Sequence, residues 1–245
     1  MKRYKVIVQY DGLAFNGWQT QKNGRTIQGE IELALSKINK SKNVRIHGAG
    51  RTDTGVHATG QVAHFDLETS LDSLHLKDAI NGNLSDDIRI MSCEQVSMDF
   101  HARFSAIRRH YNYRIRTDGF ILDRTYTWIV EPVDITILND AADILIGEHD
   151  FTSFSKNNED LEHHRCIVYE SIWKAENQLV NYSIIANRFL HHMIRYLVGT
   201  MIEIARGNYK MEDFIYLFNN PQKNVHIFKA PPHGLVLCQI DYDKT

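Results

Sequence analysis

The chain has 245 residues, 43% of them hydrophobic and 24% charged, and carries a formal net charge of −2. No stretch approaches the roughly 20 apolar residues that a membrane span requires, and the first residues lack the pattern of a secretory signal peptide. The three cysteines are an odd number without Cys-x-x-Cys spacing, which favours neither a disulfide framework nor a cysteine zinc site. We therefore expect a cytoplasmic globular protein that is not associated with a membrane.

The first half of the chain alternates between strand and helix patterns. Thr26 is the expected N-cap of the first helix, whose apolar residues recur at helical spacing. The predicted elements are a strand at 4–10, a helix at 26–38, a strand at 61–67, a short helix at 74–84 and a strand at 88–96. This order is typical of a split βαβ module of the ferredoxin-like type.

The second half has a similar order of elements without visible sequence repetition. Its most regular helix begins at Leu190, and a hairpin is expected to turn at Asn177. The predicted elements are a strand at 108–117, a helix at 135–147, hairpin strands at 168–177 and 178–187, the helix from Leu190, a helix at 211–219 and a strand at 235–242.

Together, the two halves predict an α+β fold. We expect two ferredoxin-like halves, 1–104 and 105–245, that form a mixed, largely antiparallel sheet flanked by helices, with the active-site cleft between them. The chain has no low-complexity linker, so the boundary near residue 104 is expected to be packed.

The stretch "HGAGRTDTGVHATGQVAHF", residues 47–65, places four glycines around Asp53. Glycine at this density suits a loop that wraps a ligand or presents one side chain. Arg51 lies two residues from Asp53, and a nearby guanidinium keeps a carboxylate ionised, as a nucleophile requires. On spacing alone, an Asx-turn at Asp53 assisted by Thr52 and Thr54 is the more common arrangement.

The segment from Arg103 to Arg124 holds six arginines, Arg108 among them, against two aspartates, with four aromatic residues interleaved. It is either a solvated strand face or a surface for RNA stacking and phosphate contact. Strand periodicity places Tyr111 and Tyr113 on one face. Both are core aromatics by default, although one of them could close over a flat base or act as an acid or base.

Arg188 and Arg195 lie seven residues apart on or near the helix from Leu190, off its apolar stripe, and surface positions are the default for both. His191 and His192 would diverge by about 100° as neighbours on a helix, so we expect no metal site there. The sequence has no GxSxG elbow, Walker phosphate loop or GxGxxG dinucleotide motif.

Several motifs, in order along almost the whole chain, resemble the tRNA pseudouridine synthase A family. The matching stretches are "YDGLAFNGWQTQKNGRTIQGEIELAL", "GAGRTDTGVHATGQVAHF", "FHARFSAIRRHYNYRI", "NRFLHHMIRYLVGTMIEIARG" and "KAPPHGLVL". Two departures are small: Thr54 stands where alanine is common, and Tyr196 where asparagine is frequent.

The resemblance implies an isomerase that converts uridine to pseudouridine at positions 38, 39 and 40 of the tRNA anticodon stem-loop, without metal or organic cofactor. It also implies a homodimer whose two clefts share one tRNA. Asp53 is then the nucleophile, Arg51 its neighbour, Tyr111 the residue stacked beside the target base and Arg195 a charge partner of Asp53. From the charge pattern, Arg108 and Arg188 are further candidates for substrate binding.

Two other classes remain open from the residues alone. A glycosidase would also use a carboxylate at an anomeric carbon, although it needs a second carboxyl group that the loop does not obviously supply. A non-catalytic RNA-binding module would explain paired ferredoxin-like halves with aromatic residues on a strand, although the RNP1 pattern is missing.

Overall fold

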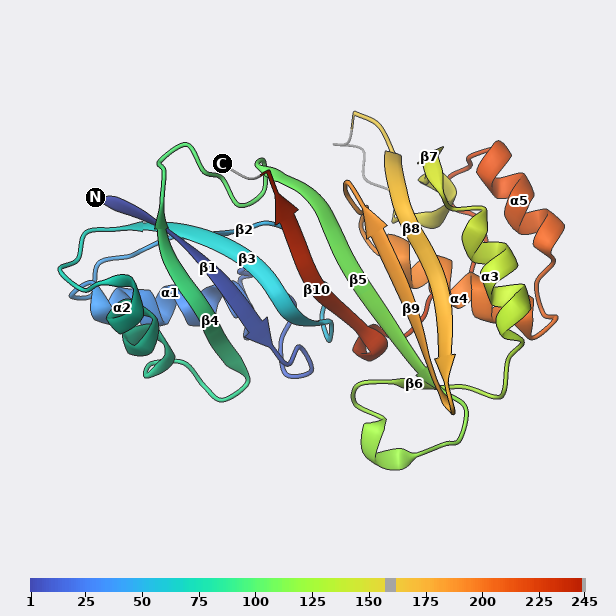
Figure 1. Ribbon diagram of the computed structural model, residues 1–245, viewed down its shortest axis with the longest axis horizontal. Helices are drawn as coiled ribbons and strands as arrows, with labels where there is room; N and C mark the ends of the chain where they lie inside the picture. The colour runs from blue at the N-terminus through green and yellow to red at the C-terminus, as the bar shows by residue number, and fades with distance from the viewer. Residues whose placement is uncertain (157–161, 244–245) are drawn as a thin grey trace. The chain divides into compact units, whose positions relative to one another are not determined.

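The computed structural model describes residues 1–156 and 162–243, which form two compact units (Figure 1). The first unit is Met1–Ile107 together with the last strand from Val236 on, and the second is Arg108–Leu235. The last strand is part of the first unit, where it pairs with one of the strands of that unit.

The first unit is built on a sheet in the order β4-β1-β3-β10 (Figure 1). Its elements are β1 (Lys2–Tyr10), α1 (Ile27–Ile38), β2 (Ile46–Gly48), β3 (His57–Leu67), α2 (Ser73–Asn81), β4 (Ile88–Val96) and β10 (Leu235–Tyr242). Neighbouring strands are antiparallel except for β10, which runs parallel to β3, and the short β2 pairs with β3. The Thr26 hydroxyl caps α1 as expected, accepting a bond from the Gly29 amide at 3.2 Å.

The second unit is built on an antiparallel sheet in the order β5-β9-β8-β7. Its strands and α-helices are β5 (Ala106–Arg116), β6 (Trp128–Ile129), α3 (Ile135–Asp143), β7 (Gly147–Asp150), β8 (Arg165–Glu176), β9 (Leu179–Ala186), α4 (Met193–Ala205) and α5 (Met211–Asn219). Three short 3-10 helices cover Ile121–Asp123, Thr152–Phe154 and Pro232–Gly234. The β8–β9 hairpin turns at Asn177, which has a φ of 56°.

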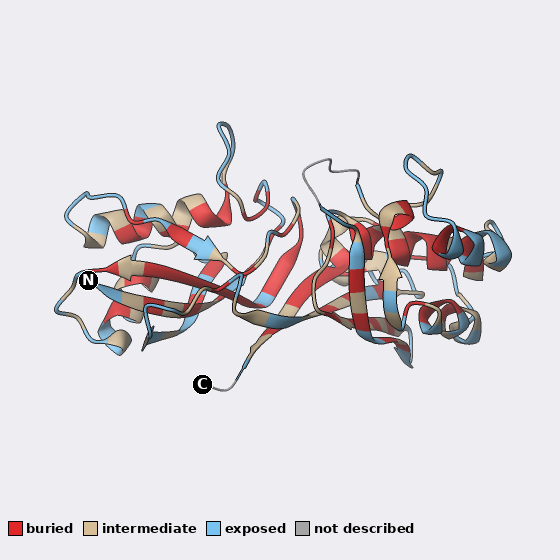
Figure 2. Ribbon diagram, turned by 90° about the horizontal axis from the view of Figure 1, so that it is seen from above, coloured by how far each residue is buried: buried red, intermediate tan, exposed pale blue. Residues whose placement is uncertain are grey.

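Buried residues alternate with more exposed ones along β1 and β9, whereas β3 is buried along almost its whole length (Figure 2). On β5, Tyr111, Tyr113 and Ile115 are buried, whereas Arg114 is exposed, so the predicted two faces of this strand are confirmed. Helix α2 contacts β4 in the first unit, and α3 contacts β8 and α4 in the second.

The predicted α+β class, with a mixed, largely antiparallel arrangement of strands flanked by helices, is confirmed. The finer assignment of each half to the ferredoxin-like type stays a prediction. In the part of the chain that the structure describes, the helices are all too short or too polar to cross a lipid bilayer.

Candidate active site

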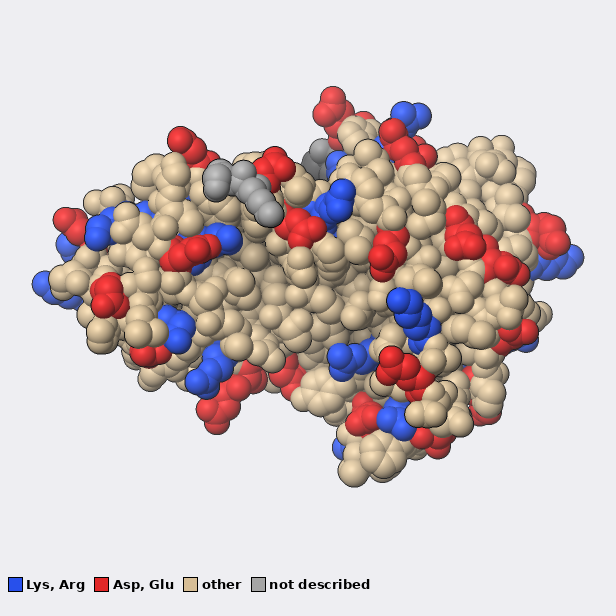
Figure 3. Space-filling model, viewed as in Figure 1, with Lys and Arg blue, Asp and Glu red and all other residues tan. Residues whose placement is uncertain are grey.

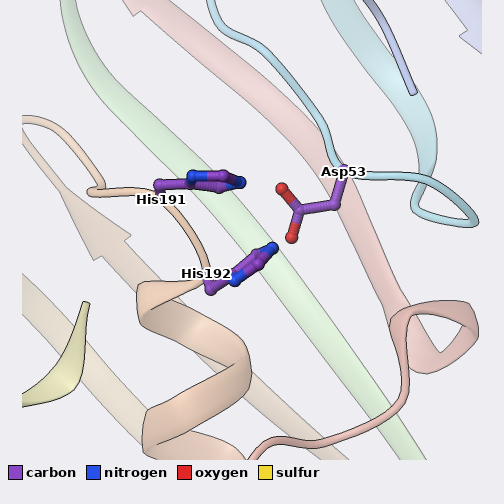
Figure 4. A group of neighbouring side chains, drawn as sticks. All are labelled: Asp53, His191 and His192. Carbon is purple, nitrogen blue, oxygen red and sulfur yellow. The ribbon is translucent and has the colours of Figure 1, made fainter. Parts of the chain in front are cut away.

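Asp53 lies in the first unit, on the loop that leads from β2 into β3 (Figure 4). A backbone turn follows it, in which the Val56 amide donates to the Asp53 carbonyl at 3.2 Å. Gly55 occupies the turn with a φ of 78°, a left-handed conformation that glycine adopts without strain. The Asp53 side chain is half-buried, and that of Arg51 is exposed. The chain therefore presents the carboxylate at the start of a tight, glycine-dependent turn.

The segment between β1 and α1 holds this loop in place. The Trp18 amide donates to the Thr52 carbonyl at 3.1 Å, and the Thr52 hydroxyl bonds the Tyr10 hydroxyl at 2.9 Å. A Cβ atom on Gly17 would lie 2.5 Å from the Thr52 carbonyl oxygen. The loop and this segment are therefore in van der Waals contact at a position that has no room for a side chain.

These contacts concern the Asx-turn at Asp53 that the sequence alone favours. The Thr52 hydroxyl, which was expected to assist an Asx-turn, is instead directed to Tyr10. Burial raises the pKa of Tyr10 to about 12, so its phenol is protonated at neutral pH and acts as a hydrogen-bonding anchor. On the other side, the Gln61 amide donates to the Gly50 carbonyl at 3.0 Å.

The supporting residues Tyr10, Gly17, Trp18 and Gln61 were missed as parts of the site from the residues alone. For Gly17 and its neighbours Tyr10 and Trp18, the signal is the pair of glycines in "YDGLAFNGWQ", because a loop glycine permits close backbone approach; Gln61 has no such local signal.

In the second unit, Tyr111 points to the buried face of β5 and is 8% exposed. The Tyr111 and Phe189 rings pack edge to face, with centroids 5.2 Å apart and planes at 82°. Phe189 directly follows Arg188, so the structure brings Tyr111 and the Arg188 segment together. This contact limits the orientations that the Tyr111 ring can adopt.

Tyr113, two residues along β5, has a different environment. Its hydroxyl donates to the Pro231 carbonyl at 2.8 Å, and burial raises its pKa far above the usual value while the nearby Arg195 charge lowers it slightly. Tyr113 is therefore a core anchor for the "KAPPHG" segment, which leaves Tyr111 as the tyrosine of this strand for a role at a base.

Arg195 is 9% exposed, so the expected surface position is wrong. Its Nε atom donates to the Ala230 carbonyl at 2.9 Å, and the Ala230 amide donates back to the Arg195 carbonyl at 2.9 Å. Farther along α4, a Cβ atom on Gly199 would lie 2.5 Å from the Phe228 carbonyl oxygen. The guanidinium is buried because α4 packs tightly on residues 228–230, a contact distant in sequence that helical periodicity does not reveal.

Helix α4 begins at Met193, three residues later than expected. His192 precedes it with a φ of 64°, and the rings of His191 and His192 lie with centroids only 4.0 Å apart (Figure 4). The expectation that these two side chains diverge as on a helix is therefore wrong. Arg188 also precedes α4 and is half-buried, so helical spacing does not relate it to Arg195.

Three arginines of the segment from Arg103 to Arg124 differ in whether the fold uses their guanidinium groups. Arg116 is held by Asp118 and Asp123, and Arg109 donates to the Asn187 carbonyl, so both have structural partners. Arg108 is exposed, with its guanidinium 4.7 Å from the centre of the Tyr169 ring. Figure 3 shows side chains of both charges interspersed on one face of the molecule.

Comparisons with known proteins found a matching family model, named relatives and a solved structure. The family model described as tRNA pseudouridine synthase matches residues 6–105 and 141–243. A Geobacillus protein named tRNA pseudouridine synthase A is 37% identical over 99% of both chains, and a Chlorobium limicola protein of the same name is 39% identical over 99% of this chain and 100% of its own. A chain from the crystal structure of a Cbf5–Nop10–Gar1 complex is similar over 95% of this chain and 57% of its own length, at 11% identity and a TM-score of 0.40.

Proposed function

Because the chain belongs to the tRNA pseudouridine synthase family and isomerises tRNA uridine, we propose that its targets are the uridines at positions 38, 39 and 40 of the anticodon stem-loop. The observation that carries the proposal is the family match over both units, together with the motifs of the Asp53 loop and the relatives' name. The family assignment also sets aside the glycosidase and the non-catalytic RNA-binding module.

We propose that Asp53 is the catalytic carboxylate. The reaction breaks the C1′–N1 glycosidic bond and forms a C1′–C5 bond, while the hydrogen on C5 leaves and N1 gains one. A carboxylate close to C1′ serves this exchange either by attacking C1′ or by removing the C2′ proton. The fixed turn at Gly55 and the Thr52 contacts support this role, because they limit the positions that Asp53 can adopt.

The remaining candidates support the same substrate. The target base must leave its stack, which costs a few kcal/mol, and an aromatic partner worth about 1 to 3 kcal/mol offsets part of that cost. We propose Tyr111 for this stacking, because its ring is braced by Phe189. We propose that Arg195 is a charge partner of Asp53 and that Arg51 acts beside Asp53 in the loop. We propose that Arg108 and Arg188 bind the tRNA backbone.

Three further properties are part of the proposal. The enzyme forms a homodimer that binds one tRNA, it needs no metal or organic cofactor, and it acts in the cytoplasm, where its tRNA substrate is found. Sedimentation of the protein with and without tRNA measures the dimer directly, and a monomer under both conditions contradicts it.

Tritium release from uridine labelled at C5 tests the target positions, because pseudouridine formation must displace that hydrogen. Three anticodon stem-loops each carry one [5-³H]uridine, at 38, 39 or 40, with stem pairing restored. A fourth carries the label only at another position. We expect release from the first three and none from the fourth. Release from the fourth alone would contradict the proposed positions, and no release from any tRNA would contradict the activity.

A further inference from the structure

A polar pocket of about 340 Å³ lies within the second unit, beside the first turns of α4. Its wall includes Tyr196, the residue that departs from the asparagine frequent in the family. The lining residues are Thr152, Ser153, Ser155, Lys156, Tyr196, Lys223, Asn224, Val225 and Ile227.

The charge of this pocket is positive. Two lining residues are lysines, Lys156 and Lys223, and both are exposed at its mouth, while the described lining contains no carboxylate. A third ammonium group, on Lys229, lies 5.9 Å from the centre of the Tyr196 ring. A concave surface with two or three ammonium groups and no carboxylate in its described lining attracts an anion.

The serine and threonine hydroxyls of the wall, on Thr152, Ser153 and Ser155, differ in their partners. Thr152 donates to the Asp150 carboxylate at 2.6 Å, and Ser153 donates to the Leu217 carbonyl at 3.1 Å. Both hydroxyls are therefore used within the fold. The Ser155 Oγ atom is buried and has no hydrogen-bond partner among the described residues. A buried hydroxyl without a partner lowers stability, and a bound water or ion is one physical reason for such a group.

We propose that this pocket binds a phosphate group of the tRNA backbone. The inference rests on the proposed function for its ligand and adds a contact surface remote in sequence from the Asp53 loop. The two lysines supply charge without a fixed bonding geometry, as suits a phosphate, and Ser155 supplies one donor. Phosphate contacts position an RNA and do not read its bases, so the pocket orients the tRNA without selecting the uridine.

The salt dependence of tRNA affinity tests the lysines. Each lost phosphate contact flattens the slope of log affinity against log salt by about 0.7 to 0.9. We expect this change in Lys156→Ala and in Lys223→Ala, and twice as much in the double variant. The matched control is Lys174→Ala, because Lys174 is exposed on β8 and does not line the pocket. Slopes that stay at the wild-type value in all three pocket variants overturn the inference.

Ser155→Ala separates ligand binding from a structural role. Removing a buried hydroxyl that bonds nothing in the fold should leave the melting temperature unchanged or raise it, while tRNA binds several-fold more weakly. A lower melting temperature with unchanged affinity overturns the role of Ser155. If the wild-type protein binds no tRNA at all, the proposed function is contradicted and the pocket inference with it. If the wild type binds tRNA and the pocket variants bind it equally well, only the pocket inference is contradicted.

Inorganic phosphate at matched ionic strength distinguishes the source of the anion. Competition by phosphate against tRNA in the wild type, lost in Lys223→Ala, supports a shared phosphate site. Thermal stabilisation by inorganic phosphate, with tRNA affinity unaffected by the pocket substitutions, assigns the pocket to a free anion and overturns the proposal.

Discussion

Asp53 is the residue on which the proposed chemistry depends. Asp53→Asn keeps the size of the side chain and the turn at Gly55 but removes the negative charge, so pseudouridine formation should be abolished. The affinity for tRNA should stay within a few-fold of wild type, because the proposed backbone contacts are made by other residues. Tritium release and filter binding measure the two properties. Appreciable turnover by a variant that mass spectrometry shows to be free of deamidation would contradict the role of Asp53.

Tyr111 is expected to act through its ring. Tyr111→Phe keeps the aromatic surface and the contact with Phe189 but loses the phenol, so it should remain active. Tyr111→Leu loses the stacking surface, and its kcat/KM should fall by the equivalent of about 1 to 3 kcal/mol. A melting curve of each variant controls for folding, because Tyr111 is buried. Equal activity of all three proteins would remove Tyr111 from the site.

His64 should make stability depend on pH. It is 2% exposed, and its Nδ1 atom accepts a bond from the Ala102 amide at 3.1 Å. Burial, helped by the positive charges of His101, Arg3 and His47 and opposed by Asp66, lowers its pKa to about 4. In the unfolded chain a histidine has a pKa of about 6.5, so between about pH 6.5 and about pH 4 the unfolded state binds more protons than the folded state. The stability that neutral His64 contributes is therefore complete above about pH 6.5 and is lost as the pH falls toward about 4.

His64→Gln provides the comparison, because the amide oxygen of glutamine still accepts a hydrogen bond and does not titrate in this interval. The wild-type melting temperature should fall more steeply than that of the variant as the pH is lowered from about 6.5 to about 4. Parallel curves for the two proteins would show that other groups, and not His64, cause the acid sensitivity.

The contact between the Asp53 loop and the segment before α1 makes a matched pair of glycine substitutions informative. Gly17 has a φ of 80°, and a Cβ atom added there would lie 2.5 Å from the Thr52 carbonyl oxygen. A Cβ atom added at Gly50 would have no heavy atom within 4 Å. Gly17→Ala should therefore lower stability by about 1 to 3 kcal/mol and reduce turnover by moving Thr52 and Asp53. Gly50→Ala should change neither. Melting curves and tritium release compare them, and equal effects would contradict this account.

Elements with a strong local signal were predicted correctly. Thr26 caps α1 as expected, α5 and β10 have the predicted bounds, and the hairpin turns at Asn177. The strands β2, β6 and β7 were missed because two to four residues are too few to show alternation. The start of α4 was placed too early because apolar spacing continues into Leu190, while the left-handed conformation of His192 gives no sequence signal.

The candidate site shows the same limit. The loop and Asp53 are visible in the sequence because glycines and a carboxylate cluster within a few residues. The burial of Arg195 depends on Ala230, 35 residues away, and no local pattern reports that contact. The pairing of Thr52 with Tyr10 is likewise distant in sequence. The local cluster of candidate residues was therefore visible in the sequence, whereas the packing that holds it in place was not.

A protein with net charge −2 must bind a polyanion through local groups. Each phosphate contact adds about 0.7 to 0.9 to the slope of log affinity against log salt, so tRNA affinity should fall steeply with salt despite the acidic average. Arg108→Ala should flatten this slope by one contact without changing which uridine is modified. A slope near zero for the wild type would contradict tRNA binding, and an unchanged slope in the variant would contradict a phosphate contact by Arg108.

The parallel pairing of β10 with β3 affects how the enzyme matures on the ribosome. The strand that follows the Asp53 loop obtains this neighbour only after the entire sequence of the second unit, Arg108–Leu235, has been translated. Until then β3 lacks this partner at His57 and Ala58, although β1 and β2 of its unit are already available to pair with it. Completion of the first unit is thereby coupled to synthesis of the second, and nascent chains cannot assemble the full sheet beside the Asp53 loop ahead of the segment that carries Tyr111 and Arg195.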